Sequence, residues 1–277
     1  MSNAKKENQI TTTAKNELTL PSDMMQEFLQ DCINKAGMEN IDQRDYITPH
    51  ICLVQALSPQ RRKTHEAYIE GAVEGDFVLT STKEILKSFN FIFVASQKNY
   101  MEYTINDKGQ KDQFIAKHLE ESILDTCVRD YKGAKGYFTP AGNIIVPRRT
   151  AYVLLINEDG TTQRAIITFK NTGFQAWKLL NTMMGNQKIK VGNKIIPATC
   201  TYGFVYKAES KEETKKEGSF YNFSFTDLKQ MVNEDQFKAA KAFYNDFKKN
   251  NIIEASEIEE APIVNSTLDI PEAEMPF

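Results

Sequence analysis

The stretch AYVLLINEDGTTQRAIITF, Ala151–Phe169, determines the fold class of this 277-residue chain. Two runs rich in β-branched and aromatic residues flank the pair Asp159-Gly160. An Asp-Gly pair between two such runs is typical of a tight β-hairpin, because glycine accepts the positive φ that the turn requires. We therefore expect two antiparallel strands joined by this turn.

Runs of the same kind extend the β pattern along the chain. They predict further strands at 51–57, 76–81, 89–103, 143–146, 188–191, 199–208 and 219–225, with a second hairpin turn at Gly192-Asn193 and a charged loop at 210–218. Helical spacing of apolar residues predicts helices at 21–37, 112–130, 172–184 and 233–249. Regular strand–helix alternation is absent, which argues against a doubly wound parallel sheet. We predict a β-rich α+β fold, an elaborated OB-like β-barrel with peripheral helices.

The charge is unevenly distributed. The chain has a net charge of -3, yet Glu254–Phe277 contains seven acidic residues and no Lys or Arg, so the preceding residues carry +4. Residues 1–20 are polar and lack sustained periodicity. We expect a disordered arm at 1–20, one domain at 21–250 and an acidic, disordered protein-interaction tail at 251–277.

Several classes of protein are disfavoured. The longest apolar runs, such as Phe91–Ala95, are about as long as a strand, whereas a membrane-spanning helix needs about 20 apolar residues. The first twenty residues lack the apolar segment of a signal peptide, which predicts a cytoplasmic location. Four scattered cysteines without a CxxC pair predict reduced thiols rather than a zinc site.

Catalytic motifs are also missing from the sequence. It has no phosphate-binding GxxxxGK[ST] loop, no GxSxG elbow and no HExxH pair. We therefore expect no enzyme activity, no cofactor and no metal. One alternative stays open, a metal-dependent nuclease or recombination enzyme whose carboxylates Asp76, Glu102 and Asp107 would converge on a divalent cation.

Basic residues interleaved with aromatic residues are a stronger lead. Proteins that bind single-stranded nucleic acid place Lys and Arg along the phosphates and stack bases on aromatic rings. We expect surface positions and DNA contacts for Arg61, Arg62, Lys63, Lys98, Tyr100, Tyr103, Lys132, Lys135, Tyr137, Arg148, Arg149 and Tyr152.

The acidic tail carries a family resemblance. Its last residues, DIPEAEMPF, resemble the tip of bacterial single-stranded DNA-binding proteins, whose acidic tails end on Asp-Ile-Pro-Phe. The segments ICLVQALSP (51–59) and TFKNTGFQAW (168–177) are similar to phage-encoded proteins grouped with such binders.

The resemblance implies a phage-type single-stranded DNA-binding protein that acts in replication or recombination in the host cytoplasm. It also implies that the tail recruits replication or recombination proteins, through Asp269, Ile270, Pro271, Glu274, Pro276 and Phe277. Homo-oligomerisation is left open. The second alternative is a virion or scaffold interaction protein, which would show no affinity for DNA.

Overall fold

The computed structural model describes residues 22–34, 36–41, 45–106, 110–131, 134–215, 218–249 and 253–254. The chain divides into two units, residues 1–42 and 43–277. In the first unit, helix α1 spans Ser22–Asn34, which confirms the predicted helix. Gly37, with φ of +83°, lies just beyond its end in the left-handed conformation common at helix C-termini. Four large apolar residues of α1 are exposed, namely Met24, Phe28, Leu29 and Ile33.

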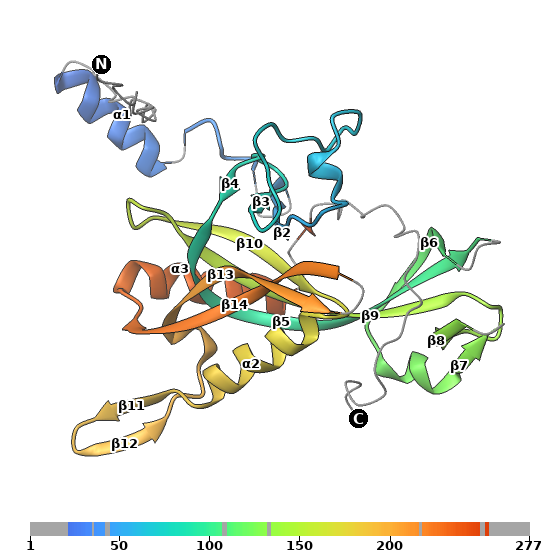
Figure 1. The fold of residues 1–277 in the computed structure, drawn as a ribbon. Helices are drawn as coiled ribbons and strands as arrows, with labels where there is room; N and C mark the ends of the chain where they lie inside the picture. The colour runs from blue at the N-terminus through green and yellow to red at the C-terminus, as the bar shows by residue number, and fades with distance from the viewer. Residues whose placement is uncertain are drawn as a thin grey trace, which may run out of the picture. The chain divides into compact units, whose positions relative to one another are not determined.

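A mixed sheet forms the second unit, and eleven strands belong to it among the described residues (Figure 1). Its main path runs in the order β14-β13-β5-β9-β10-β2-β3-β4. These strands are β2 (His50–Leu53), β3 (Phe77–Leu79), β4 (Ile85–Leu86), β5 (Ser88–Ile105), β9 (Ile144–Ile156), β10 (Thr162–Phe169), β13 (Phe204–Lys215) and β14 (Gly218–Met231). Neighbours on this path are antiparallel except β10 and β2, which are parallel.

The hairpin predicted from Ala151–Phe169 lies at the centre of this sheet as β9 and β10, with Ile156 opposite Thr162. Successive residues of β9 alternate between two hydrophobic clusters, with Val153 in one and Leu154 in the other. Helix α2 (Gly173–Gly185) packs on the first face and helix α3 (Glu234–Lys248) on the second (Figure 1). Because both faces are covered there, the central strands have runs that are apolar on both faces, such as residues 151–155 of β9 and 165–167 of β10.

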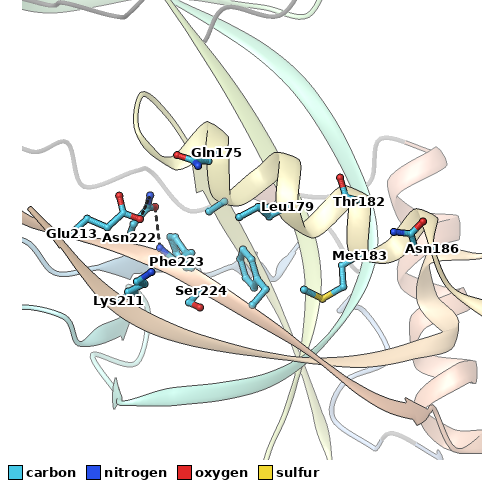
Figure 2. A pocket seen from close by; sticks show the side chains of 12 residues that line it. Gln175, Leu179, Thr182, Met183, Asn186, Lys211, Glu213, Asn222, Phe223 and Ser224 are labelled. Atoms are coloured by element: carbon cyan, nitrogen blue, oxygen red, sulfur yellow. Dashed lines mark hydrogen bonds between the residues drawn. The ribbon is translucent and has the colours of Figure 1, made fainter. Parts of the chain in front are cut away.

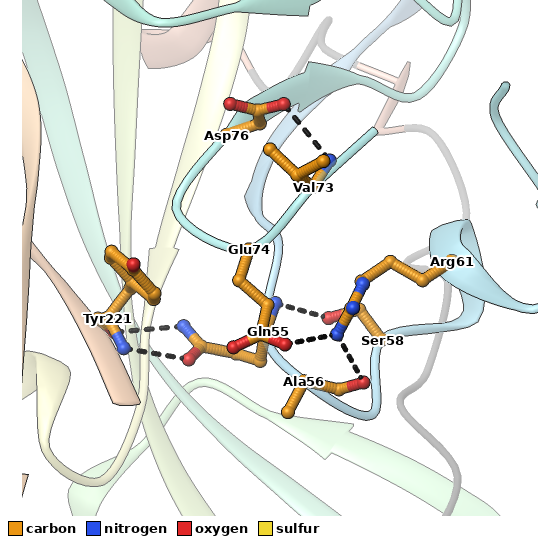
Figure 3. A network of polar contacts seen from close by, with 8 residues as sticks. All are labelled: Gln55, Ala56, Ser58, Arg61, Val73, Glu74, Asp76 and Tyr221. Carbon is orange, nitrogen blue, oxygen red and sulfur yellow. Dashed lines mark hydrogen bonds and ion pairs between the residues drawn. The ribbon is translucent and has the colours of Figure 1, made fainter. Parts of the chain in front are cut away.

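The sheet curves until its β14 edge approaches β2. The side-chain amide of Gln55 donates to the Tyr221 carbonyl at 2.8 Å and accepts from the Tyr221 backbone N–H at 2.9 Å (Figure 3). The rings of Phe77 and Phe223 lie 5.3 Å apart across the same approach. No strand pairing joins β14 to β2 within the described residues, so the sheet is not a closed barrel. The predicted β-rich α+β class is confirmed.

Strands β5 and β9 continue beyond the two helices into a smaller lobe, at the right of Figure 1. We call residues 98–106, 110–131 and 134–149 the distal lobe. It adds β6 (Lys111–His118) to β5, β8 (Ala134–Phe138) to β9, and β7 (Val128–Tyr131) to β8. The 3-10 helix η3 (Glu121–Thr126) packs on one of two small aromatic cores there.

The helix predicted at 112–130 is wrong, and so is the loop predicted at 210–218. Residues 111–118 form β6, because pairing with the end of β5 satisfies their backbone groups and overrides the local helical spacing. The described residues of the predicted loop, 210–215 and 218, belong instead to β13 and β14, which form a long antiparallel ribbon with Lys211 opposite Asn222.

A separate hairpin follows α2, and Figure 1 shows it projecting at the lower left. Strands β11 (Lys188–Val191) and β12 (Lys194–Pro197) pair only with each other among the described residues. Gly192 has a φ of +59° in the predicted turn. The remaining elements are β1 (Ile47–Thr48) and β15 (Ile253–Glu254), which pair with each other, η2 (Pro59–Arg61) and η4 (Thr201–Gly203). No helix in the described part of the chain is long and apolar enough to cross a membrane.

Candidate nucleic-acid interface

The structure brings several of the predicted site residues together, but inside the distal lobe. Lys98 lies opposite Arg149, and Tyr100 lies opposite Pro147, on the paired strands β5 and β9. The side chains of Tyr100 and Tyr103 have 0% of their surface exposed, and Arg148 has 2%. The expectation that these rings lie on the surface is wrong, because they offer no face to a base.

The buried rings instead contact the two arginines. The guanidinium group of Arg148 donates to the Tyr103 hydroxyl and lies 5.9 Å from the centre of that ring. Arg149 lies 5.9 Å from the Tyr100 ring and 5.6 Å from the Phe174 ring at the start of α2. Burial is the main cause that raises the pKa of Tyr100. These contacts hold the base of the distal lobe together.

The other predicted aromatic residues are also packed. Arg129 covers the Tyr137 ring at 3.8 Å from its centre. Tyr152 is buried under α3, with its ring 4.9 Å from that of Phe247. Lys98 is exposed and pairs with Glu121 at 2.7 Å. The predicted contacts Lys132, Asp269, Ile270, Pro271, Glu274, Pro276 and Phe277, together with the side chain of Lys135, lie outside the described residues.

The three cations at residues 61–63 differ in their contacts, and Figure 3 shows those of Arg61. The Arg61 guanidinium donates to the Ala56 carbonyl at 2.8 Å and pairs with Glu74, so it stabilises the loop itself. Arg62 and Lys63 are exposed and make no ion pair with other described residues. Of the three, these two side chains are available for phosphates.

Two of the carboxylates considered for a metal site serve separate networks. Asp76 accepts from Lys87 at 2.6 Å. Glu102 accepts from Asn143 at 2.7 Å and contacts His118 at 2.8 Å; although burial raises its pKa, these hydrogen bonds outweigh that effect and lower it. Asp107 lies outside the described residues. Within the described ranges, no cluster of three His, Cys, Asp or Glu side chains is placed to hold a metal ion.

A stretch without acids is a feature that motif reasoning missed. Between Gly160 and Ala208 the sequence has no Asp or Glu, and a count of charges along the chain would have found it. Its seven cations are Arg164, Lys170, Lys178, Lys188, Lys190, Lys194 and Lys207. The stretch forms β10, α2, the β11–β12 hairpin and the start of β13. Four of its lysines, Lys178, Lys188, Lys190 and Lys194, are exposed.

Helix α2, from this stretch, and the β13–β14 ribbon, most of which lies beyond it, enclose an open groove of about 500 Å³ (Figure 2). Its floor is apolar, with Leu179 and Met183 from the helix and Phe223 and Phe225 from β14. Leu179 is 60% exposed, which is unusual for a leucine on the inner side of a groove. Polar groups form the rim, namely Gln175, Thr182, Asn186, Lys211, Asn222 and Ser224, with Glu213 as its one carboxylate among the lining residues.

The groove is preformed. The rings of Phe223 and Phe225 lie nearly parallel, with centres 5.8 Å apart and planes 12° apart, and both pack on Phe169 beneath them. The Asn222 amide donates to the Thr172 carbonyl at the N-terminus of α2, at 3.2 Å. Helix and strand are therefore held at a fixed separation.

Comparison with known proteins gives a family. The chain belongs to the Pam3 phage gp34-like protein family, whose model matches residues 14–253. No curated protein and no solved structure matches the chain.

Proposed function

We propose that this protein binds single-stranded DNA without sequence preference, through the groove between α2 and β14. The observation that carries the proposal is this open groove with an apolar floor, which has Lys211 on its rim, exposed Lys178 on α2 beside it, and one carboxylate, Glu213, among its lining residues. Membership of a phage family is compatible with a role in phage DNA replication or recombination.

The chemistry of the groove suits an unpaired strand. Bases have apolar faces, and the floor formed by Leu179, Met183 and the two phenylalanines provides a surface for them. Amide side chains on the rim, such as Gln175 and Asn186, can donate to or accept from any base edge. Lys178 and Lys211 lie where they can neutralise phosphates, which releases counterions and makes the affinity depend on salt.

The proposal includes two finer expectations. The first is an OB-like architecture, supported by the curvature that brings β14 to Gln55. The second is that the acidic tail from Glu254 to Phe277 competes with DNA for the cations of the body and captures replication or recombination proteins through Phe277 and its acidic neighbours. Truncation after Glu254 should therefore tighten DNA binding, most strongly at low salt.

The test is fluorescence anisotropy with labelled oligo-dT and the variant Leu179→Asp. A carboxylate on the groove floor should repel phosphates and lower the affinity at least tenfold, which is about 1.4 kcal/mol. Leu119→Asp is the matched control, because Leu119 is 52% exposed in the distal lobe. Wild-type protein that fails to bind oligo-dT at low salt, or an unchanged affinity in Leu179→Asp, would exclude the groove.

A second function rests on the same exposed floor. A virion or scaffold interaction protein would seat an apolar side chain of a protein partner on Leu179. That function predicts no affinity for oligo-dT and ordered oligomers in sedimentation experiments. The oligomers should dissociate in Leu179→Asp and persist in Leu119→Asp.

A further inference from the structure

The β11–β12 hairpin is a cationic ribbon with both faces exposed. Residues 188–197 include Lys188, Lys190 and Lys194 and no acid. All ten residues are exposed except Ile189, which is half-buried, and Ile195 is exposed to 69%. Packing among the described residues does not account for these exposed apolar side chains and unbalanced positive charges. Such a surface is typical of a site that binds a partner.

The register of the hairpin places cations on both faces. Residues that pair directly share a face, so Lys190 and its partner Ile195 lie on the same side as Lys188. Lys194 pairs with Val191 on the opposite side. Each face therefore combines positive charge with exposed β-branched side chains.

The base of the ribbon is anchored to the body. The Ala198 backbone N–H donates to the Gln187 carbonyl at 2.9 Å, which closes the open end of the hairpin. The Gln187 side chain is buried and donates to Asp227 on β14 at 2.7 Å. Ile189 packs against the main hydrophobic cluster. These contacts hold the base of the ribbon, so that it projects in a defined direction.

We propose that this ribbon inserts into a groove of double-stranded DNA. Each strand has four residues, so the ribbon extends about 13 Å. The major groove is about 12 Å wide and about 8.5 Å deep, and it admits a two-stranded β-ribbon. Phosphates line both walls of such a groove, which matches the cations on both faces, whereas a single strand would pass along one face only. Val191 and Lys194 flank the turn at the tip of the ribbon, so they would lie nearest the base edges, where the valine can contact thymine methyl groups.

This site goes beyond the proposed function, because it takes duplex rather than an unpaired strand. Asn186 on the groove rim lies two residues before the ribbon begins. A protein with both sites would hold a junction between single-stranded and double-stranded DNA. The duplex site does not require the groove, so the two proposals can fail independently.

The test uses full-length protein, a labelled duplex and labelled oligo-dT, each at two salt concentrations. The variant carries Lys188→Gln, Lys190→Gln and Lys194→Gln, and its matched control carries Lys241→Gln, Lys248→Gln and Lys249→Gln at exposed positions of α3 and its C-cap. Three lost phosphate contacts should lower duplex affinity at least tenfold and reduce the log–log salt slope by about 2.7. Oligo-dT affinity should stay within about twofold of wild type.

A second variant, Ile195→Asp, leaves every lysine in place and should also weaken duplex binding. The proposal is overturned if the wild type does not bind duplex, or if duplex and oligo-dT affinities fall equally. It is overturned too if the control variant loses as much duplex affinity. If the triple lysine variant loses no duplex affinity in protein truncated at Glu254, the lysines bind the acidic tail and not DNA. That result also overturns the proposal.

Discussion

The base of the distal lobe and the surface formed by residues 173–197, which we call the α2–hairpin surface, both combine cations with apolar side chains, but the base of the lobe buries them and the α2–hairpin surface exposes them. In the distal lobe, Arg148 and Arg149 are buried against Tyr103 and Tyr100. On the α2–hairpin surface the cations are lysines, and they are exposed. The planar guanidinium group stacks on rings and tolerates burial, whereas the strongly hydrated ammonium group stays in water. Interleaved Arg and Tyr thus indicate packing, and Lys without nearby acids indicates a binding surface.

The largest expected effect tests whether the distal lobe is structural. Tyr103→Ala removes a fully buried ring and should lower the free energy of unfolding by about 3–5 kcal/mol. Ile195→Ala on the hairpin should change it by less than about 0.5 kcal/mol, because that side chain is exposed. Urea denaturation of both variants measures the difference. Equal, small losses would show that the distal lobe adds little to stability.

A pair of exchanges between Arg and Lys sharpens the same comparison. Arg148→Lys keeps the charge but loses the planar guanidinium group and its bond to the Tyr103 hydroxyl, so stability should fall by about 1.5–3 kcal/mol. The reciprocal change, Lys190→Arg on the hairpin, should leave both the urea midpoint and the duplex affinity unchanged. An unchanged urea midpoint in Arg148→Lys would show that the buried guanidinium group does not stabilise the distal lobe.

Local turn and helix signals predicted much of the central fold. Asp159-Gly160 and Gly192-Asn193 mark turns that depend only on their own residues, and both hairpins form. The helices at 172–184 and 233–249 are also confirmed. The helix expected at 112–130 failed because the pairing of those residues with β5 is not visible in their spacing.

The site was harder to predict for the same reason. The burial of Tyr100 depends on the packing around it, with Arg149 nearly fifty residues away along the chain. No local pattern around Tyr100 reports that partner. The groove likewise joins α2 to β14 across the intervening hairpin and β13. The acid-free stretch, by contrast, was readable from the sequence as a plain count of charges.

A smaller effect concerns the pH dependence of the distal lobe. Burial raises the pKa of Glu102, but the hydrogen bonds from Asn143 and His118 leave it below its ordinary value of 4.5. A lowered carboxyl pKa stabilises the fold above pH 4.5, and this contribution disappears as the pH falls through the folded-state pKa. In Glu102→Gln, the loss of stability between about pH 5 and pH 3 should be shallower than in wild type.

The matched control for that experiment is Glu120→Gln, at an exposed position of the same lobe. Its acid denaturation profile should overlay that of the wild type. Identical profiles for Glu102→Gln and the wild type would mean that this carboxylate contributes nothing to acid stability.

The smallest expected effect separates the cations of the 61–63 loop that have no ion pair with other described residues from the one that is bound within the loop. Arg62 and Lys63 are exposed, whereas Arg61 is bound to Ala56 and Glu74. If both exposed cations contact a single strand, Arg62→Ala with Lys63→Ala should reduce the magnitude of the log–log salt slope for oligo-dT by about 1.4. Arg61→Ala should instead destabilise the loop and leave the slope unchanged in protein that remains folded. A slope that changes only in Arg61→Ala would reverse this assignment and show that hydrogen bonding within the loop does not prevent contact with phosphate.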